Sequence, residues 1–273
     1  MCVDDGSSDA TLELLRREGD SDPRIRFVQN IGEGANCARN FGALIFANGD
    51  VIAFCDPGDI WAPDKLSQLA VSFDGGKADA VFGKVTFFHD DPTMESVSYT
   101  TPSGPLSIPV LLGEDPVHSV SNIAVRRPSF LRSGGFKEDL KQTGALDWLI
   151  RLVGTGAHVV GTDRSQTWCR SSKCSFDHDL RDMHRTRGAA LEAAAQFGHT
   201  ASAQSEAIFL RRLSHRALLS QQARAMPLIF ALEGVLRSPA GFFNPPRRGF
   251  GTLFGALLSS ILPSRISRML FAL

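Results

Sequence analysis

Two carboxylates that follow a short apolar run are the clearest candidates for chemistry in this chain. The run, Val51–Cys55, has the length and composition of a strand buried on both faces. It ends in a turn that carries Asp56 and Asp59, with Gly58 between them. In an open α/β sheet, ligands bind at the carboxyl ends of the strands. The two acids could therefore hold a divalent cation or the hydroxyls of a ribose, although an ordinary Asp-Pro-Gly-Asp turn would have the same sequence.

The elements that would position these acids alternate between strand and helix. The sequence predicts, in order, a half strand at residues 1–3, a helix at Thr11–Glu18, a strand at Arg24–Gln29 and a helix at Ala35–Ala47. Further strands are expected at Ala80–Phe88, Ser119–Val125 and Val159–Trp168. This order indicates an α/β fold with a doubly wound, mostly parallel sheet. Because the chain opens on a half strand, we expect it to be an amino-terminally truncated form of a longer protein.

Charge is distributed unevenly along a chain whose net charge is zero. The overall balance gives no indication of nucleic-acid binding. Residues 1–199 carry 20 Lys and Arg against 27 Asp and Glu, whereas residues 200–273 carry 9 Arg against 2 Glu. The split predicts a basic tail that meets an acidic surface or a membrane. The five cysteines form no CxxC pair or zinc pattern, which favours a reducing cytosol.

Three ordered motifs resemble those of family 2 glycosyltransferases, which have the GT-A fold. The motifs are Val3-Asp4-Asp5-Gly6-Ser7-Ser8-Asp9, Asn30-x-Gly-x-Gly-x-x-x-Ala38-Arg39-Asn40-x-Gly42 and Phe54-x-Asp56-x-x-Asp59-x-Trp61-x-Pro63. The resemblance continues weakly to Asp147–Arg151 and stops near residue 180. It implies transfer of a sugar from a nucleotide diphosphate donor to an acceptor hydroxyl. The family's weak preference for uridine implies a UDP-sugar, and direct displacement by a single base implies inversion.

The resemblance also implies roles for individual residues on the donor side. Asp5, together with Asp4, would face the nucleotide base, and Arg39 would lie near the base or the diphosphate. Asp56 would lie near the ribose and a divalent metal, Mn2+ or Mg2+. From the residues alone, Asp5 could instead belong to a helix-capping turn, and Arg39 could be a solvated helix residue.

Departures from the family pattern put the metal site in doubt. Gly58 stands at the second acidic position of the family's Asp-x-Asp-Asp motif, where the usual metal ligand lies, so the expected metal pair becomes Asp56 and Asp59. The family's first strand, with its Pro-x-Tyr-Asn type segment, has no counterpart here.

The acceptor-side base can be aligned in two ways. Matching the aromatic residue Trp148 makes Asp147 the base, whereas counting back from Arg151 without a gap leaves Ala145 in the base's place. We expect Asp147 to be the base.

The last third of the chain reads as helical, at Leu180–Phe197, at Glu206–Arg237 with a kink or division at Pro227, and at Gly249–Ser264. The last of these is an uncharged run of sixteen residues, short of the roughly 20 that span a bilayer. Its apolar stripe comprises Leu253, Phe254, Leu257, Leu258, Ile261 and Leu262, and the flanking arginines are Arg247, Arg248, Arg265 and Arg268. This pattern is typical of an in-plane membrane helix, and equally of a helix packed on the catalytic domain or in a dimer.

Together these features predict a GT-A-like domain at residues 1–180 and a helical, basic extension at residues 181–273. The expected function is a glycosyltransferase of bacterial surface or exopolysaccharide synthesis that acts on a saccharide or lipid-linked acceptor. It would be cytoplasmic and peripheral at the inner membrane. The main alternative is a degenerate, non-catalytic binding or scaffold protein of the same fold. A nucleotidyltransferase is disfavoured because the chain has no Gly-rich, Lys-bearing phosphate loop.

Overall fold

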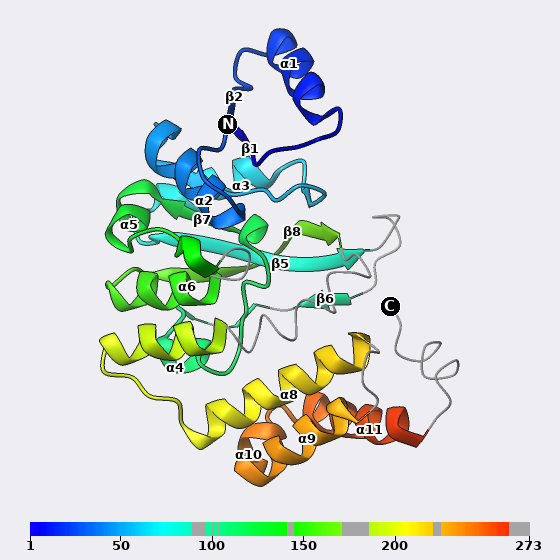
Figure 1. Cartoon of the computed structure of the whole chain (residues 1–273). Helices are drawn as coiled ribbons and strands as arrows, with labels where there is room; N and C mark the ends of the chain where they lie inside the picture. The colour runs from blue at the N-terminus through cyan, green and yellow to red at the C-terminus, as the bar shows by residue number, and fades with distance from the viewer. Residues whose placement is uncertain are drawn as a thin grey trace.

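A computed structural model of the chain describes residues 1–88, 97–99, 101–102, 104–140, 145–170, 186–220 and 225–261. It consists of a curled sheet with helices on both faces and a group of carboxyl-terminal helices stacked below (Figure 1).

The chain begins with a small parallel unit at the top of Figure 1. Strand β1 (Cys2–Asp4) pairs in parallel with β2 (Phe27–Gln29), and α1 (Thr11–Ser21) connects them. Helix α2 (Ala35–Asn40) follows and widens into a π-helical segment, η1 (Phe41–Phe46). The single helix expected over this stretch is thus correct in extent, but its second half has the wider π geometry.

The larger sheet has six strands in the order β3, β7, β5, β8, β4, with β6 paired to β5. They are β3 (Val51–Ala53), β4 (Ile60–Trp61), β5 (Ala80–Phe88), β6 (Val97–Tyr99), β7 (Ile123–Arg126) and β8 (Val159–Arg170). The expectation of a mostly parallel sheet is wrong, because among the described strands of this sheet only β5 and β8 run parallel and the other pairs are antiparallel. Parallel neighbours need crossover connections of a dozen or more residues, and β6 follows β5 after only eight.

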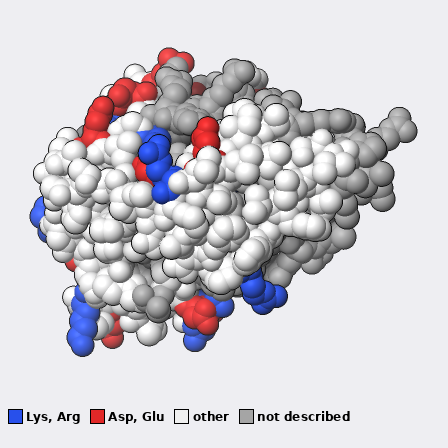
Figure 2. Space-filling view, turned by 90° about the horizontal axis from the view of Figure 1, so that it is seen from below, with Lys and Arg blue, Asp and Glu red and all other residues white. Residues whose placement is uncertain are grey.

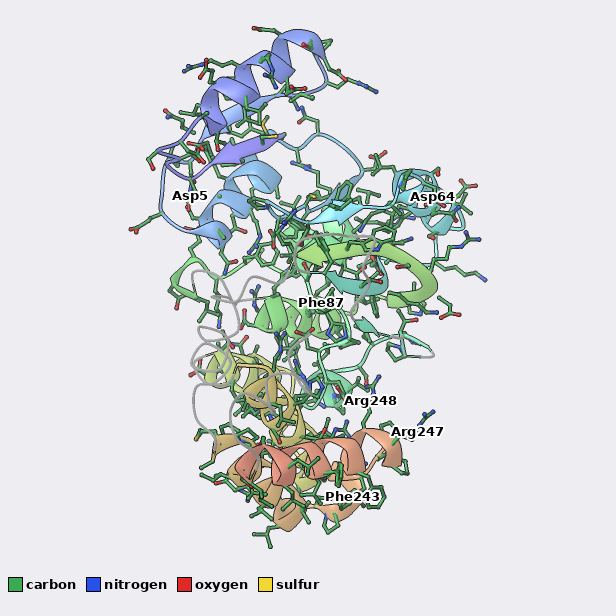
Figure 3. All side chains as sticks on the ribbon, turned by 90° about the vertical axis from the view of Figure 1, so that its right-hand side faces the viewer. Asp5, Asp64, Phe87, Phe243, Arg247 and Arg248 are labelled. Carbon is green, nitrogen blue, oxygen red and sulfur yellow. The ribbon has the colours of Figure 1, made fainter. Side chains whose placement is uncertain are left out.

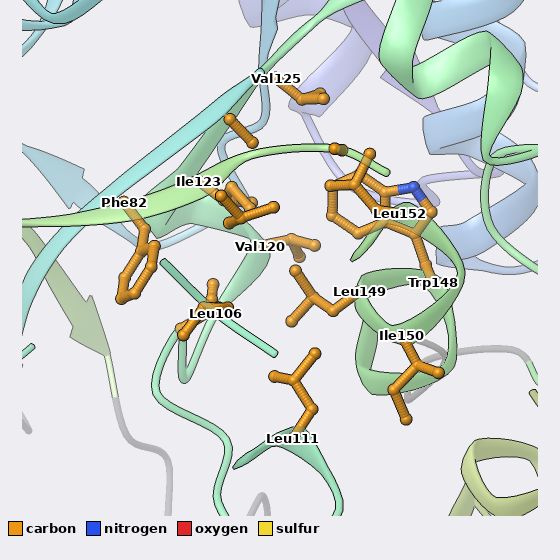
Figure 4. Packing of buried hydrophobic residues seen from close by; sticks show 14 of the residues in the cluster. Phe82, Leu106, Leu111, Val120, Ile123, Val125, Trp148, Leu149, Ile150 and Leu152 are labelled. Carbon is orange, nitrogen blue, oxygen red and sulfur yellow. The ribbon is translucent and has the colours of Figure 1, made fainter. Parts of the chain in front are cut away.

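The core lies between the sheet and the helices on its two faces. Helices α4 (Ile108–Leu111), α5 (Arg127–Arg132) and α6 (Ala145–Gly154) cover one face, and α3 (Lys65–Asp74) covers the other. Two short 3-10 turns, η2 (Val120–Asn122) and η3 (Glu138–Leu140), join these elements. The main cluster is apolar and closely packed (Figure 4); its members include Phe82, Leu111, Ile123, Val125, Trp148, Leu149, Ile150 and Leu152.

The carboxyl-terminal helices are residues 186–196, α8 (Ala203–Ser220), α9 (Met226–Arg237), α10 (Pro239–Phe242) and α11 (Pro246–Ile261). Pro227 lies at the start of α9, where a proline is tolerated, so it marks a division rather than a kink.

These helices are joined to the α/β part by buried contacts. Arg187 donates to the carbonyl of Leu112 at 2.6 Å, and Arg211 donates to Glu114 at 2.7 Å. The helix at residues 186–196 also contributes three alanines to the main core, and the ring of Phe197 packs directly against Gly154. The division of the chain near residue 180 therefore stays a prediction.

Candidate functional site

The first expected donor-side residues lie at the carboxyl end of β1. The Asp4 carboxylate is buried and accepts the backbone N–H groups of Gly6 and Ser7 at 3.2 Å each. The pKa of Asp4 lies below its ordinary value, mainly because of a hydrogen bond from the Ser7 side chain and also because of the backbone hydrogen bonds. Asp5 is exposed and accepts from the Asn30 amide at 2.7 Å and from the Gly34 N–H at 3.0 Å (Figure 3). Asp5 therefore joins the end of β1 to the loop that begins α2.

Arg39 and Asp56 form an ion pair between α2 and the end of β3. The guanidinium reaches Asp56 Oδ1 at 2.6 Å through Nη2 and at 3.2 Å through Nε. Arg39 also donates to Asn36 Oδ1 at 2.9 Å and lies over the ring of Phe136. The arginine side chain is only 14% exposed and the Asp56 side chain 32% exposed. Arg39 is therefore a largely buried partner of Asp56 rather than a solvated helix residue.

Aromatic packing fixes the position of Asp56, which follows β3 in the chain. Phe54, two residues earlier, packs against Phe130, Phe136 and Trp148 with ring centroids 5.6, 5.2 and 6.3 Å away. The N–H of Asp56 donates to the Ser121 hydroxyl at 2.8 Å. These contacts hold the Asp56 backbone on a rigid part of the core.

Asn40 belongs to the second sequence motif, but sequence reasoning gave it no role. Its amide accepts the Phe136 N–H at 2.9 Å and donates to the Phe136 carbonyl at 2.8 Å. Gly135, at φ 63°, lies so close that an added Cβ would come within 2.7 Å of the Asn40 oxygen. The pair therefore ties α2 to the segment that supplies Phe136.

The turn after Asp56 does not present a set of metal ligands. Asp59 accepts the Arg170 N–H at 3.0 Å through Oδ1 and the Ser119 hydroxyl at 3.3 Å through Oδ2. Asp56 is paired with Arg39, and Gly58 contributes no side chain. Among the described residues no group of three or more His, Cys, Asp or Glu could hold a metal ion. The residues of this turn thus do not fit the Mn2+ or Mg2+ expected at Asp56 and Asp59.

Lys65 is a part of the site that sequence reasoning missed. Its Nζ is buried beneath the turn, donates to the Ser121 carbonyl at 2.7 Å and to Thr167 Oγ1 at 2.8 Å, and lies over the Trp61 ring. The Trp61 indole N–H donates to the same carbonyl. Burial lowers the pKa of Lys65 to about 8. A single lysine directly after an Ala-Pro-Asp helix start gave no signal of this burial.

The lowered pKa of Lys65 predicts that the free energy of unfolding rises with pH just above neutrality. Below pH 8 the lysine is charged in both states, and its burial penalty is fully present. Between pH 8 and the unfolded pKa of 10.5 the folded state binds fewer protons, so the free energy of unfolding increases, by about 1 kcal/mol from pH 7.5 to 9.

Denaturant unfolding across this pH range should show the rise in the native protein and lack it in Lys65→Met. The nearby Cys55 and Cys169, whose pKa values burial raises, oppose it from about pH 8 upward, because the unfolded thiols then begin to ionise, but they do so equally in both proteins. An equal rise in both proteins would contradict this account.

Asp147 lies inside the protein rather than on a surface open to an acceptor. Its Oδ2 accepts from Arg151 at 2.7 and 2.9 Å, and Lys137 Nζ lies 3.0 Å from its Oδ1. The carboxylate has no exposed surface. Ala145, the alternative position for the base, is the first residue of α6 and is half-buried.

Comparison with solved structures identifies the class of fold. The chain is similar to S. aureus TarS, with a TM-score of 0.52 and 15% identity, over 93% of this chain and 48% of that one. It is also similar to residues 1–349 of TarS in complex with UDP-GlcNAc, with a TM-score of 0.50 and 14% identity, over 97% of this chain and 72% of that one. These likenesses, with the mixed sheet and its flanking helices, confirm the α/β, GT-A-like fold.

The amino-terminal part of the chain is similar in sequence to a known family. Residues 1–132, just under half of the chain, match the model of glycosyl transferase family 2. An uncharacterized glycosyltransferase of Haemophilus influenzae is 40% identical over 69 residues, which are 25% of this chain and 27% of that protein. The chain therefore matches about a quarter of the length of this relative.

Proposed function

We propose that this protein transfers a sugar from a UDP-sugar to an acceptor hydroxyl. The observation that carries the proposal is the network Asp5–Asn30–Gly34 and Arg39–Asp56, which connects the carboxyl ends of β1 and β3 through α2. It lies within the 132 residues that match the glycosyltransferase family. The UDP-GlcNAc complex of TarS, whose fold is similar, supports uridine as the base.

The donor-side residues divide the work of holding the nucleotide. Asp4 fixes the turn after β1, and Asp5 faces the base from its exposed position. Asp56 accepts hydroxyls of the ribose, because Arg39 occupies its Oδ1 and about a third of its side chain remains exposed. Carboxylates are suited to this role because they accept from two hydroxyls at once.

On the acceptor side we propose Asp147 as the base that takes the proton of the attacking hydroxyl, with inversion at the sugar carbon. Its Oδ1 must first be released from Lys137. The Lys137 side chain is 32% exposed, so movement of this lysine would open a path to the carboxylate. Arg151 would hold the other oxygen in place.

The experiment that tests this function measures UDP release from a panel of UDP-sugars. We expect release by the native protein, and a rate about 100- to 10,000-fold lower in Asp147→Asn, because the amide cannot accept the proton. Binding of UDP should be unchanged in the variant, since Asp147 lies outside the donor network. Equal release rates in the two proteins would contradict the assignment of the base.

A non-catalytic binding protein is the second candidate, and the burial of Asp147 favours it. It would bind UDP or a UDP-sugar without releasing UDP from any sugar in the panel. The same assay, followed by a UDP titration, therefore separates the two candidates.

A lipid-linked acceptor at a membrane surface would fit the exposed apolar face of the last helices. Among the described residues no helix is long and apolar enough to cross a bilayer. Instead, large apolar side chains are exposed along α9 and α11, at Ile229, Leu232, Leu236, Phe250, Phe254, Leu257 and Ile261. We call these seven residues the apolar face. Seen from below, this side of the molecule is made mostly of uncharged residues (Figure 2).

Helix α11 packs on the other carboxyl-terminal helices and leaves apolar side chains exposed on its outer side. Its small residues, among them Gly255 and Ala256, face α8 and α9, and the larger Phe254 and Leu257 face outward. Leu253 and Leu258 of the expected stripe are half-buried, and Leu262 lies outside the described residues. Arg247 and Arg248 lie in the first turn of the helix (Figure 3), and Arg265 and Arg268 lie outside the described part. We propose that the apolar face rests on the inner surface of a bacterial membrane during synthesis of a surface polysaccharide or exopolysaccharide.

A further inference from the structure

We infer that Arg170 supplies the positive charge for the donor's diphosphate at the place where the family holds a metal. The site would then bind its donor without a divalent cation. This inference rests on the proposed function, and it replaces the metal expected at Asp56 and Asp59.

The first observation is the position of Arg170 relative to Gly58. A Cβ added to Gly58 would lie 3.6 Å from both Cδ and Nε of Arg170. The arginine side chain thus occupies the space into which an acidic residue at this position would extend. Gly58 also has a φ of 91°, which glycine adopts without strain.

The second observation is the engagement of both neighbouring carboxylates. Asp56 binds Arg39 at 2.6 Å, and each oxygen of Asp59 accepts a hydrogen bond, one from the Arg170 backbone and one from Ser119. A divalent metal would have to displace these donors and would still lack a third acidic ligand among the described residues.

The third observation is that the fold holds Arg170 in this position. It ends β8, where it lies opposite Phe88 of β5, and its guanidinium lies 4.9 Å from the centre of the Phe88 ring. The pairing of β4 with β8 brings the turn that contains Gly58 alongside it. The Asp56–Asp59 turn is therefore flanked by two arginines, with Arg39 at its start and Arg170 at its centre.

The chemistry of the leaving group suits such an arrangement. When the acceptor oxygen forms its bond to the sugar carbon, the bond from that carbon to the diphosphate oxygen breaks, and its electron pair leaves with UDP. The proton of the acceptor goes to the base. A guanidinium donates two parallel hydrogen bonds to phosphate oxygens and stays charged at any working pH, so it can stabilise the added negative charge.

The test is calorimetric titration with UDP and with uridine, in a chelator and then in Mn2+. The native protein should bind UDP equally well in both conditions. Arg170→Ala should bind UDP about 10- to 100-fold more weakly and bind uridine as the native protein does, because the proposed contacts with the base and the ribose are made by Asp5 and Asp56. Arg164→Ala is the matched control: it removes an exposed arginine six residues earlier on the same strand and should leave UDP binding unchanged.

A second pair of variants tests the inference without removing Arg170. Gly58→Asp places a carboxylate beside the guanidinium and should weaken UDP binding in the chelator. Gly58→Asn brings the same backbone strain without the charge, and should bind UDP more tightly than Gly58→Asp.

The outcomes separate this inference from the proposed function. UDP binding that is lost in the chelator and restored by Mn2+ overturns the inference and leaves the proposed function intact. Native affinity for UDP in Arg170→Ala also overturns it. A native protein that binds neither UDP nor uridine in either condition overturns both.

Discussion

Replacement of Asp56 by alanine is expected to lower the affinity for UDP by roughly 30- to 1,000-fold, the equivalent of about 2–4 kcal/mol. The variant loses the carboxylate proposed to accept the ribose hydroxyls. It also leaves the largely buried Arg39 guanidinium without its acidic partner. The measurement is calorimetric titration of the native and variant proteins with UDP.

The control for this prediction is Asp64→Ala. Asp64 is an exposed carboxylate in the same loop, at the start of α3, and makes no side-chain capping bond there (Figure 3). Its loss changes the charge equally and should leave the affinity for UDP within about twofold of the native value. If Asp56→Ala has the same melting temperature as the native protein and still binds UDP with native affinity, the donor site lies elsewhere.

Replacement of both Phe250 and Phe254 by serine is expected to release the protein from vesicles that contain phosphatidylglycerol. The two rings are 62% and 64% exposed and form part of the apolar face. Burial of a phenylalanine side chain is worth about 1.5–3 kcal/mol when complete, so the double variant should partition at least about 10-fold less to the vesicles. Because both side chains face outward, the melting temperature should change little. Sedimentation with the vesicles provides the measurement.

The matched control replaces Leu66 and Val71 by serine. These residues are 63% and 74% exposed on α3, which covers the opposite part of the molecule from α11. Their replacement removes a similar exposed apolar area and should leave vesicle binding unchanged. Equal loss of binding in both double variants would mean that general hydrophobicity, and not the apolar face, attaches the protein to the bilayer.

The local pattern of apolar and polar residues was sufficient to predict the secondary-structure elements that depend on near neighbours in the sequence. The apolar composition of Ala80–Phe88 predicted β5 with its bounds, because both faces of that strand are covered by helices. The pairing of Arg39 with Asp56 was not predicted, although both residues belong to the family motifs. The direction of the strands could not be predicted in this way. Strand direction depends on which end of the sheet each long connection reaches. Strand β7, for example, lies antiparallel to both of its neighbours, β3 and β5.

The environments of three charged residues were beyond prediction because they are set by distant segments. Lys65 is buried by Ser121 and Thr167, which come from other strands and turns. Asp147 has a cation ten residues before it, Lys137, in a different element. Arg170 meets Gly58 only because β4 pairs with β8. No spacing within the sequence encodes these meetings, so each becomes visible only when the sheet is assembled.

The packing of Phe197 against Gly154 restricts which substitutions these two positions can accept during evolution. Any side chain at residue 154 would collide with the ring, which comes from beyond the expected domain boundary. A larger residue at position 154 is therefore tolerable only when position 197 becomes smaller. Substitutions in the α/β part and in the helices that follow it are thus coupled, and the two regions cannot be exchanged independently between related proteins.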